Sequence, residues 1–156
     1  MTDAVQDRPT PRLTPHLCVA GASDAIDFYT RALDATELFR LPGPDGRLMH
    51  ASLLVNGAMV MLNDEYPEMG GLGPKARGGT AVTLHLHVPD VDAAVARAVD
   101  AGARLVMPVA DMFWGDRYGL IEDPFGHQWS FATPVRSVSP QEMQDAVVKM
   151  GADHGA

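Results

Sequence analysis

The sequence Thr-Leu-His-Leu-His-Val at residues 83–88 alternates polar and apolar side chains with a period of two. This period is typical of a β-strand whose two faces meet different environments. Residues 14–19 carry a matching sequence, Thr-Pro-His-Leu-Cys-Val. Because each copy leads into a short helical pattern, we interpret the chain as a duplicated module organised around these two strands.

The first module is predicted over residues 13–64. Its opening strand is followed by apolar residues at helical spacing, which predict a helix near residues 24–33 with Ser23 as N-cap. Three further strands are predicted at residues 36–41, 47–55 and 58–63. The last two strands are joined by Asn56 and Gly57, a pair typical of a tight hairpin turn.

The second module, residues 81–134, repeats this order. A strand and a helix that stops at Gly102 come first. Three strands follow, predicted at residues 104–108, 116–122 and 127–133. The sequence therefore predicts an α+β fold in which two βαβββ modules form a curved mixed sheet around a shared cup.

Three segments lie outside the two modules. Residues 1–12 are polar and are expected to form a disordered arm. Residues 65–80 are rich in glycine and show no periodicity, so they link the modules and are also long enough to form a lid over a site. Residues 135–156 are predicted to contain a C-terminal helix, capped by Ser139, and a frayed tail.

Composition narrows the class of protein. The 156 residues are 46% hydrophobic and 21% charged, which is typical of a soluble globular domain. A net charge of -8 without a basic cluster argues against binding to nucleic acid or to anionic membranes. No apolar run approaches the ~20 residues of a membrane span. The single cysteine, Cys18, excludes an internal disulfide and suits a reducing compartment, so we expect a cytoplasmic protein.

Five short motifs accompany this order of elements. They are Asp-Glu-Tyr-Pro-Glu at 64–68, Gly-Gly-Thr at 78–80, Val-Pro-Asp-Val-Asp-Ala at 88–93, Trp-Gly-Asp-Arg-Tyr-Gly at 114–119 and Asp-Pro-Phe-Gly-His at 123–127. The chain thereby resembles the vicinal oxygen chelate superfamily, which includes glyoxalase I, bleomycin-resistance proteins and extradiol dioxygenases, and within it the PhnB-like subgroup. The resemblance covers residues 13–134 and implies a homodimer. It predicts the fold better than the reaction, because one fold serves many chemistries.

The resemblance also locates the positions at which metal enzymes of the superfamily carry His, Gln or Glu ligands. Ungapped alignment on the motifs at residues 26–29 and 123–126 identifies those positions on the first and fourth strand of each module. They are Thr14, Met61, Thr83 and Ser130. None of these side chains is a good ligand for a divalent metal, so we expect a protein without a tightly held metal.

A small-molecule binder of the bleomycin-resistance type is therefore the first hypothesis. The residues expected to contact its ligand are His16, His50, Met61, His85, His87, Trp114, Tyr118 and Ser130. Trp114 and Tyr118 are expected at the rim, where they would stack on a planar ligand, and Met61 would form an adaptable apolar floor.

A metal-dependent lyase, isomerase or dioxygenase is the alternative. His16 and His85 lie two residues beyond the empty ligand positions, hence on the same strand face. With Glu122 they would form a set of two histidines and one carboxylate for Zn, Ni, Mn or Fe. Glu122 would then be a ligand or the catalytic base. Both hypotheses expect the imidazoles of His16 and His85 to meet across the cup.

Other polar residues are expected to serve the structure. Asp116 and Arg117 would form an ion pair, and His127 would bind the backbone of its own turn. Glu65 and Glu68, in the glycine-rich loop, are expected to be solvated. Two aromatic side chains of the last strand are expected in the core: Trp129 and Phe131.

Overall fold

The computed structural model describes residues 10–154, so the disordered arm expected at residues 1–12 lies almost entirely outside the described residues. The elements of the first module are β1 (His16–Val19), α1 (Ala22–Leu33), β2 (Thr36–Pro42), β3 (Leu48–Val55) and β4 (Ala58–Asp64). Those of the second are β5 (Thr83–His87), α3 (Val91–Asp100), β6 (Arg104–Asp111), β7 (Asp116–Glu122) and β8 (Gln128–Pro134). The linker contains η1 (Pro67–Met69) and α2 (Pro74–Arg77), and the chain continues into α4 (Pro140–Asp153).

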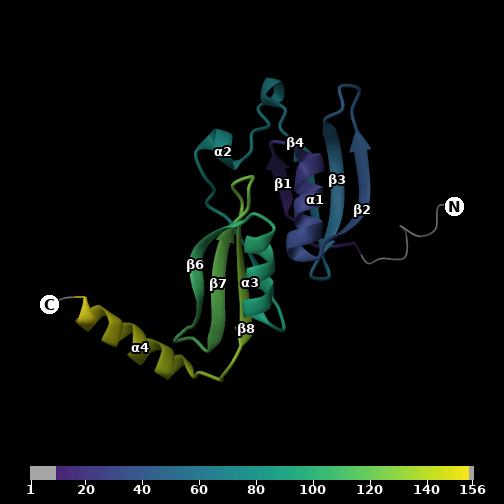
Figure 1. The fold of residues 1–156 in the computed structure, drawn as a ribbon. Coiled ribbons are helices and arrows are strands. Elements are labelled where there is room, and N and C mark those ends of the chain that lie inside the picture. Colours follow the sequence, from purple (N-terminus) through teal and green to yellow (C-terminus); the bar gives the residue numbers. More distant parts are fainter. Residues whose placement is uncertain (1–9, 155–156) are drawn as a thin grey trace.

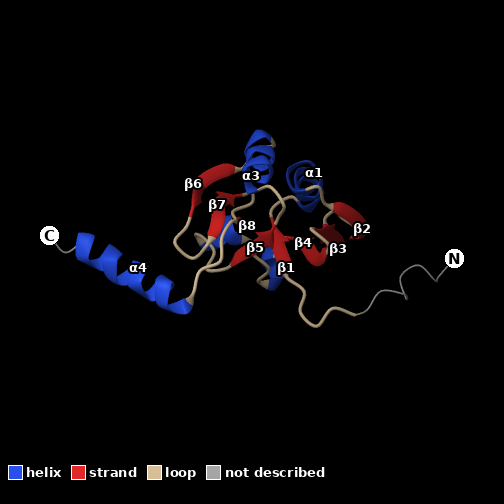
Figure 2. Cartoon of the chain, turned by 90° about the horizontal axis from the view of Figure 1, so that it is seen from below, coloured by secondary structure: helices blue, strands red, loops and turns tan. Residues whose placement is uncertain are grey.

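The strand order confirms two βαβββ modules in an α+β fold. The sheets run β1-β4-β3-β2 and β5-β8-β7-β6, with the first strand of each module parallel to the fourth and the other pairs antiparallel. The two sheets remain separate and do not close into a barrel. Helices α1 and α3 lie together on one side of the sheets (Figures 1 and 2). Within the described residues, no helix combines the length and apolar character needed to cross a membrane.

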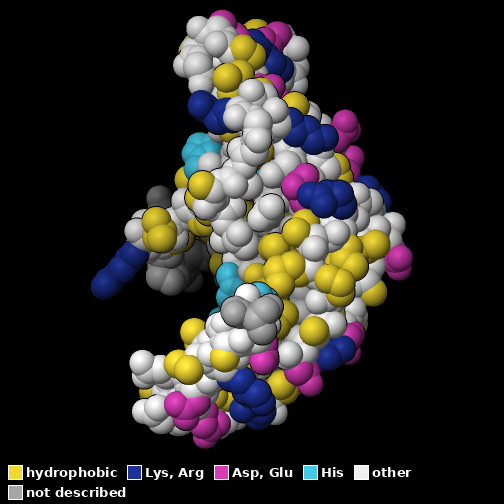
Figure 3. Space-filling view, turned by 90° about the vertical axis from the view of Figure 1, so that its left-hand side faces the viewer, with side chains coloured by type: hydrophobic (Ala, Val, Ile, Leu, Met, Phe, Trp, Pro, Cys, Tyr) yellow, Lys and Arg dark blue, Asp and Glu magenta, His cyan; other side chains and the backbone are white. Residues whose placement is uncertain are grey.

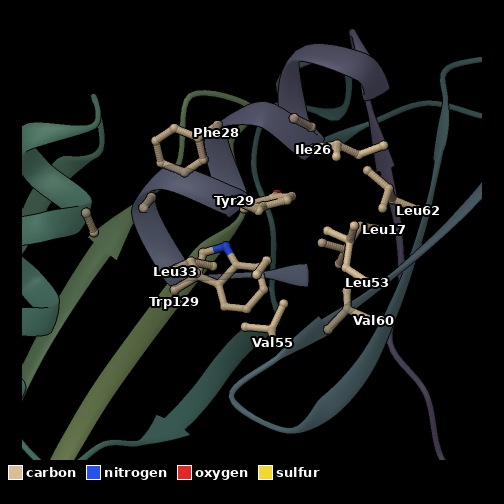
Figure 4. Close-up of a cluster of buried hydrophobic side chains, with 14 of the residues drawn as sticks. Leu17, Ile26, Phe28, Tyr29, Leu33, Leu53, Val55, Val60, Leu62 and Trp129 are labelled. Carbon is tan, nitrogen blue, oxygen red and sulfur yellow. The ribbon is translucent and has the colours of Figure 1, made fainter. Parts of the chain in front are cut away.

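The hydrophobic core lies between the helices and the sheets. Strand alternation turns Leu17 and Val19 toward α1, and both are buried. Figure 4 shows Tyr29 and Leu33 of α1 beside Trp129 of β8, so side chains of both modules meet in one core. Trp129 is 1% exposed and Phe131 2%, which confirms their predicted core positions.

The helices α1 and α3 each have a backbone N–H at their start bound by a polar side chain from the last strand of the same module. The Asp64 carboxylate accepts from the backbone N–H groups of Gly21 at 3.0 Å and Ala22 at 2.7 Å. In the second module, Thr133 Oγ1 accepts from the N–H of Val91 at 3.1 Å. Ser23 was wrong as the N-cap of α1, because α1 already begins at Ala22 and its first N–H groups are satisfied by a residue distant in sequence.

The two modules are joined by matching hydrogen bonds from their hairpin turns. The Asn56 side chain donates to the backbone oxygen of His87 at 2.7 Å. His127 Nε2 lies 3.0 Å from the backbone oxygen of Cys18, and donates to it when protonated. Each turn therefore reaches the first strand of the other module. The expectation that His127 binds its own turn was wrong for its imidazole, which crosses the module boundary.

Asp123 is the buried centre of this junction. Its side chain is 2% exposed and accepts from Tyr29 Oη at 2.6 Å and from Trp129 Nε1 at 2.9 Å. The backbone N–H groups of Phe125 and His127 donate to its other oxygen at 2.9 and 3.0 Å. Burial, followed by the nearby Asp123 carboxylate, raises the pKa of Tyr29 well above its usual value. Tyr29 therefore stays protonated and serves as a donor between the modules.

The linker is held by a contact within itself and by one to the first module. Glu65 Oε1 accepts from the N–H of Gly73, also in the linker, at 2.8 Å, and Glu68 pairs with Arg47 of the first module at 2.6 Å. The Arg47 guanidinium also lies 4.0 Å from the centre of the Tyr66 ring. The expectation of solvated glutamates was therefore wrong for Glu65, which is partly buried and bound to Gly73, whereas the Glu68 side chain is 55% exposed.

Candidate functional site

Each sheet turns its second face away from the helices, and we call this the cup face. In the first module it carries His16 opposite Met61, with Ser52 next in register. In the second it carries His85 opposite Ser130. Figure 3 shows the surface hollowed beside α4, with histidine side chains at the edge of the hollow. Strand alternation thus places polar residues where the helices leave the sheet uncovered.

The cup face of the second module carries a cluster of four aromatic rings, which we call the aromatic wall: His85, His87, Trp114 and Tyr118. His85 and His87 lie edge to face, with their centres 4.8 Å apart. The Tyr118 ring is stacked on His85 at 6.1 Å, and Trp114 meets Tyr118 edge to face at 5.7 Å. Four of the predicted ligand-binding residues therefore lie together.

Polar contacts hold two members of the aromatic wall in place. His85 Nδ1 lies 2.7 Å from Ser130 Oγ, which leaves Nε2 for a ligand. Trp114 Nε1 donates to Asp116 at 3.1 Å. The expected ion pair between Asp116 and Arg117 was wrong, because successive residues of β7 point to opposite faces of the sheet. Arg117 points to the face that carries the helices and pairs there with two aspartates. These are Asp92, at 2.7 Å, and Asp111, at 3.1 Å.

The environment of His85 favours its neutral form. Burial lowers its pKa from the usual value, the positive charge that His87 acquires lowers it further, and Asp116 opposes both. A neutral imidazole near pH 7 offers a ligand a flat ring and one nitrogen that donates or accepts.

A proton titration of His85 checks this assignment. By NMR, its midpoint is expected below the usual value of about 6.5; His87→Gln should raise it and Asp116→Asn should lower it. Because the folded-state pKa is lowered, the unfolded chain binds this proton more readily, so His85 reduces stability as the pH falls through about 6.5 and has no such effect above it. A midpoint above the usual value would contradict this account of the aromatic wall.

The cup face of the first module is simpler. His16 and His50 meet edge to face at 5.7 Å, and Phe39 lies 6.3 Å from His50. Phe39 is 52% exposed and was not singled out from the sequence. The sequence offered no separate signal for it, because Phe39 stands between other apolar and charged residues of a predicted strand. Met61 is paired with His16 in the strand register, and its role as an apolar floor stays a prediction.

The three residues of the alternative metal set have different neighbours. His16 contacts His50, whereas His85 contacts Ser130 and rings of its own module. Glu122 pairs with Arg104 at 3.0 Å. Within residues 10–154, no three His, Cys, Asp or Glu side chains are grouped closely enough to hold a metal ion. Among the described residues, His16, His85 and Glu122 are therefore not brought together as the alternative hypothesis requires.

Glu122 instead borders a separate shallow cavity of about 420 Å³. Its other lining residues include Lys75 and Thr80 from the linker and Gln128 from β8. The linker thus reaches the edge of the second module's cup face. This position agrees with either of the two roles expected for residues 65–80, a linker or a lid.

Comparisons with known proteins extend over most of the chain. A family model described as Glyoxalase/Bleomycin resistance protein/Dioxygenase superfamily matches residues 12–131. An uncharacterized protein of Mycobacterium tuberculosis is 54% identical over 144 residues, which cover 90% of this chain and 85% of that protein.

Two solved structures share the fold. A gene product from Arabidopsis thaliana is 31% identical, with a TM-score of 0.65, and the match covers 80% of this chain and 99% of that one. TioX from Micromonospora sp. ML1 is 30% identical, with a TM-score of 0.64, covering 81% of this chain and 100% of TioX. The likeness therefore includes both modules.

Proposed function

Because the chain belongs to the glyoxalase/bleomycin resistance protein/dioxygenase superfamily, we propose that it binds a small planar molecule against the aromatic wall of its second module. Within the superfamily we place it with the PhnB-like subgroup, on the motifs at residues 114–119 and 123–127. Its one cysteine, at position 18, suits a cytoplasmic location.

The observation that supports this proposal best is the arrangement of the four rings. Ligand sites are mostly apolar and aromatic, with a few polar groups that fix orientation. Trp114, Tyr118 and His85 offer ring faces, while Ser130 and Asp116 hold two of these rings in position. Since both partners of each hydrogen bond are present without a ligand, the wall is pre-organised and little side-chain entropy is lost on binding.

The charge of the molecule narrows the ligand class. A net charge of -8 repels anions at long range, and Asp116 adds a local negative charge beside the wall. Ring faces of Trp and Tyr attract cations. We therefore propose a planar aromatic ligand that is cationic or neutral, with His16, His50 and Met61 of the first module as its further contacts.

We propose that binding needs no tightly held metal. The four positions that carry ligands in the superfamily's metal enzymes hold Thr, Met, Thr and Ser, and the replacement donors have separate neighbours. The metal-dependent enzyme remains the competing function, and metal content of protein purified without an affinity tag distinguishes the two.

A thermal-shift screen with cationic, neutral and anionic planar aromatic compounds tests the proposal. Calorimetry on the hits should show binding by the unchanged protein. Trp114→Ala should weaken it about fivefold or more, since a stacking contact contributes about 1–3 kcal/mol.

Met69→Ala is the matched control, because Met69 is an exposed apolar residue of the linker, 75% accessible. It should leave affinity unchanged. A ligand whose affinity is equal in the Trp114→Ala variant and the unchanged protein would contradict the role of the wall.

A further inference from the structure

Helix α4 stands apart from the rest of the molecule. It follows β8, has no buried residue, and is seen at a distance from both sheets in Figures 1 and 2. Its start is well formed: Ser139 Oγ accepts from the N–H of Glu142 at 3.1 Å, and Pro140 occupies the first helical position. Yet 14 residues are close to the length at which an isolated helix is marginal in water. Such a helix needs a packing partner.

One face of α4 is apolar. Met143, Ala146, Val147 and Met150 are spaced so that they form a single stripe along the helix. Val147 is 53% exposed and Met150 is 49% exposed, although both would be expected in a core. Of the charged residues of the helix, Glu142, Lys149 and Asp153 border one edge of this stripe and Asp145 lies on the opposite face. The stripe is therefore an interaction surface with no partner in the described part of this chain.

The order of residues along the stripe indicates what its partner is. Read in either direction, the stripe begins and ends with methionine and has its smaller residues, Ala146 and Val147, at the centre. When two copies lie antiparallel, each Met143 faces the partner's Met150 and each Ala146 faces the partner's Val147. An interface between two copies related by a twofold axis must be complementary to itself, and this stripe meets that condition.

The charges beside the stripe favour the same arrangement. Glu142 and Lys149 lie on one flank, seven positions apart. In an antiparallel pair related by a twofold axis, the same flank of both helices meets on the same side of the interface, and the two chains run in opposite directions there. Each Glu142 therefore approaches the partner's Lys149. In a parallel pair, this flank would instead face Gln144 and Gly151. Among residues 10–154, the Glu142 carboxylate has one distant ion-pair contact, with Arg136 at 3.9 Å.

We propose that α4 is a dimerisation helix, which pairs antiparallel with α4 of a second copy of this chain through the stripe Met143, Ala146, Val147 and Met150. The pairing is independent of the proposed ligand site, because it uses a different part of the chain. The contact is short, so the dimer should dissociate on dilution through the micromolar range.

Two variants of the full chain test the surface. Sedimentation velocity of the unchanged protein should show a dimer at high concentration. Val147→Asp and Met150→Asp should each raise the dissociation constant of the dimer at least tenfold, since each substitution would place a charge in the apolar stripe. Gln144→Asp, on the polar side, is the matched control and should have little effect. A monomer at all concentrations, or a dimer that both stripe variants leave unchanged, would overturn the proposal.

Crosslinking tests the antiparallel arrangement. In a Cys18→Ser background, Ala146→Cys lies next to the twofold axis, and two copies should be joined on oxidation or by a short bismaleimide. Asp145→Cys, on the opposite face, should not be joined. If the stripe variants abolish the dimer but Ala146→Cys is not crosslinked, α4 packs on another surface of the second copy and the helix pairing is wrong.

Discussion

The Asp123→Ala variant is expected to lose about 3–5 kcal/mol of unfolding free energy, the largest effect of any single side chain in this account. Asp123 is 2% exposed and accepts four hydrogen bonds, two of them from the side chains of Tyr29 and Trp129. Removing the carboxylate leaves a buried hydroxyl and a buried indole N–H without acceptors, and each such group costs about 1–3 kcal/mol.

Urea denaturation followed by circular dichroism measures this loss. Asp123→Asn keeps one acceptor oxygen and should lose less than Asp123→Ala. Glu122→Ala is the matched control, because Glu122 is next to Asp123 in sequence. The Glu122 carboxylate forms a partly exposed ion pair with Arg104, which should contribute at most about 1 kcal/mol to stability. Equal losses in Asp123→Ala and Glu122→Ala would show that Asp123 does not hold the module junction together.

The Asp64→Ala variant is expected to lose about 2–4 kcal/mol, because its carboxylate satisfies three backbone N–H groups. Two belong to Gly21 and Ala22 at the start of α1, and the third to Leu48 at the start of β3, at 2.7 Å. Gly21, the N-cap residue of this helix, has no side chain with which to cap it. The loss therefore includes both the helix start and the attachment of β3.

The same denaturation experiment checks this value, and Asp24→Ala is its control. Asp24 lies in the first turn of α1 and favours the helix only through its charge, so its removal should cost less than about 1 kcal/mol. If Asp24→Ala were as destabilising as Asp64→Ala, the general charge at the helix start would matter more than the specific hydrogen bonds.

Local periodicity was sufficient to predict the modules. The alternation at residues 83–88 and 14–19 corresponds to β5 and β1, and the turn at Asn56 and Gly57 joins β3 to β4. The features that sequence analysis missed depend on pairs of residues far apart in the chain. Ser23 was the best local candidate for an N-cap, but Asp64, more distant in sequence, occupies that role.

The same reasoning explains the outcome for the candidate site. Tyr118 and His85 were predicted on one face because strand alternation fixes which way a side chain points, and their rings are stacked. Alternation does not determine distances between strands of different sheets. Alternation alone therefore could not predict whether His16 and His85 meet. In the structure, the ring contacts of each lie within its own module, and Glu122 pairs with Arg104.

The central claim is that the aromatic wall binds a planar ligand without a tightly held metal. The most direct measurement is calorimetry of a screened ligand with protein purified without an affinity tag, before and after exhaustive treatment with a chelator. The account predicts the same affinity in both samples. Loss of binding after chelation, restored by Zn, Ni, Mn or Fe, would contradict it.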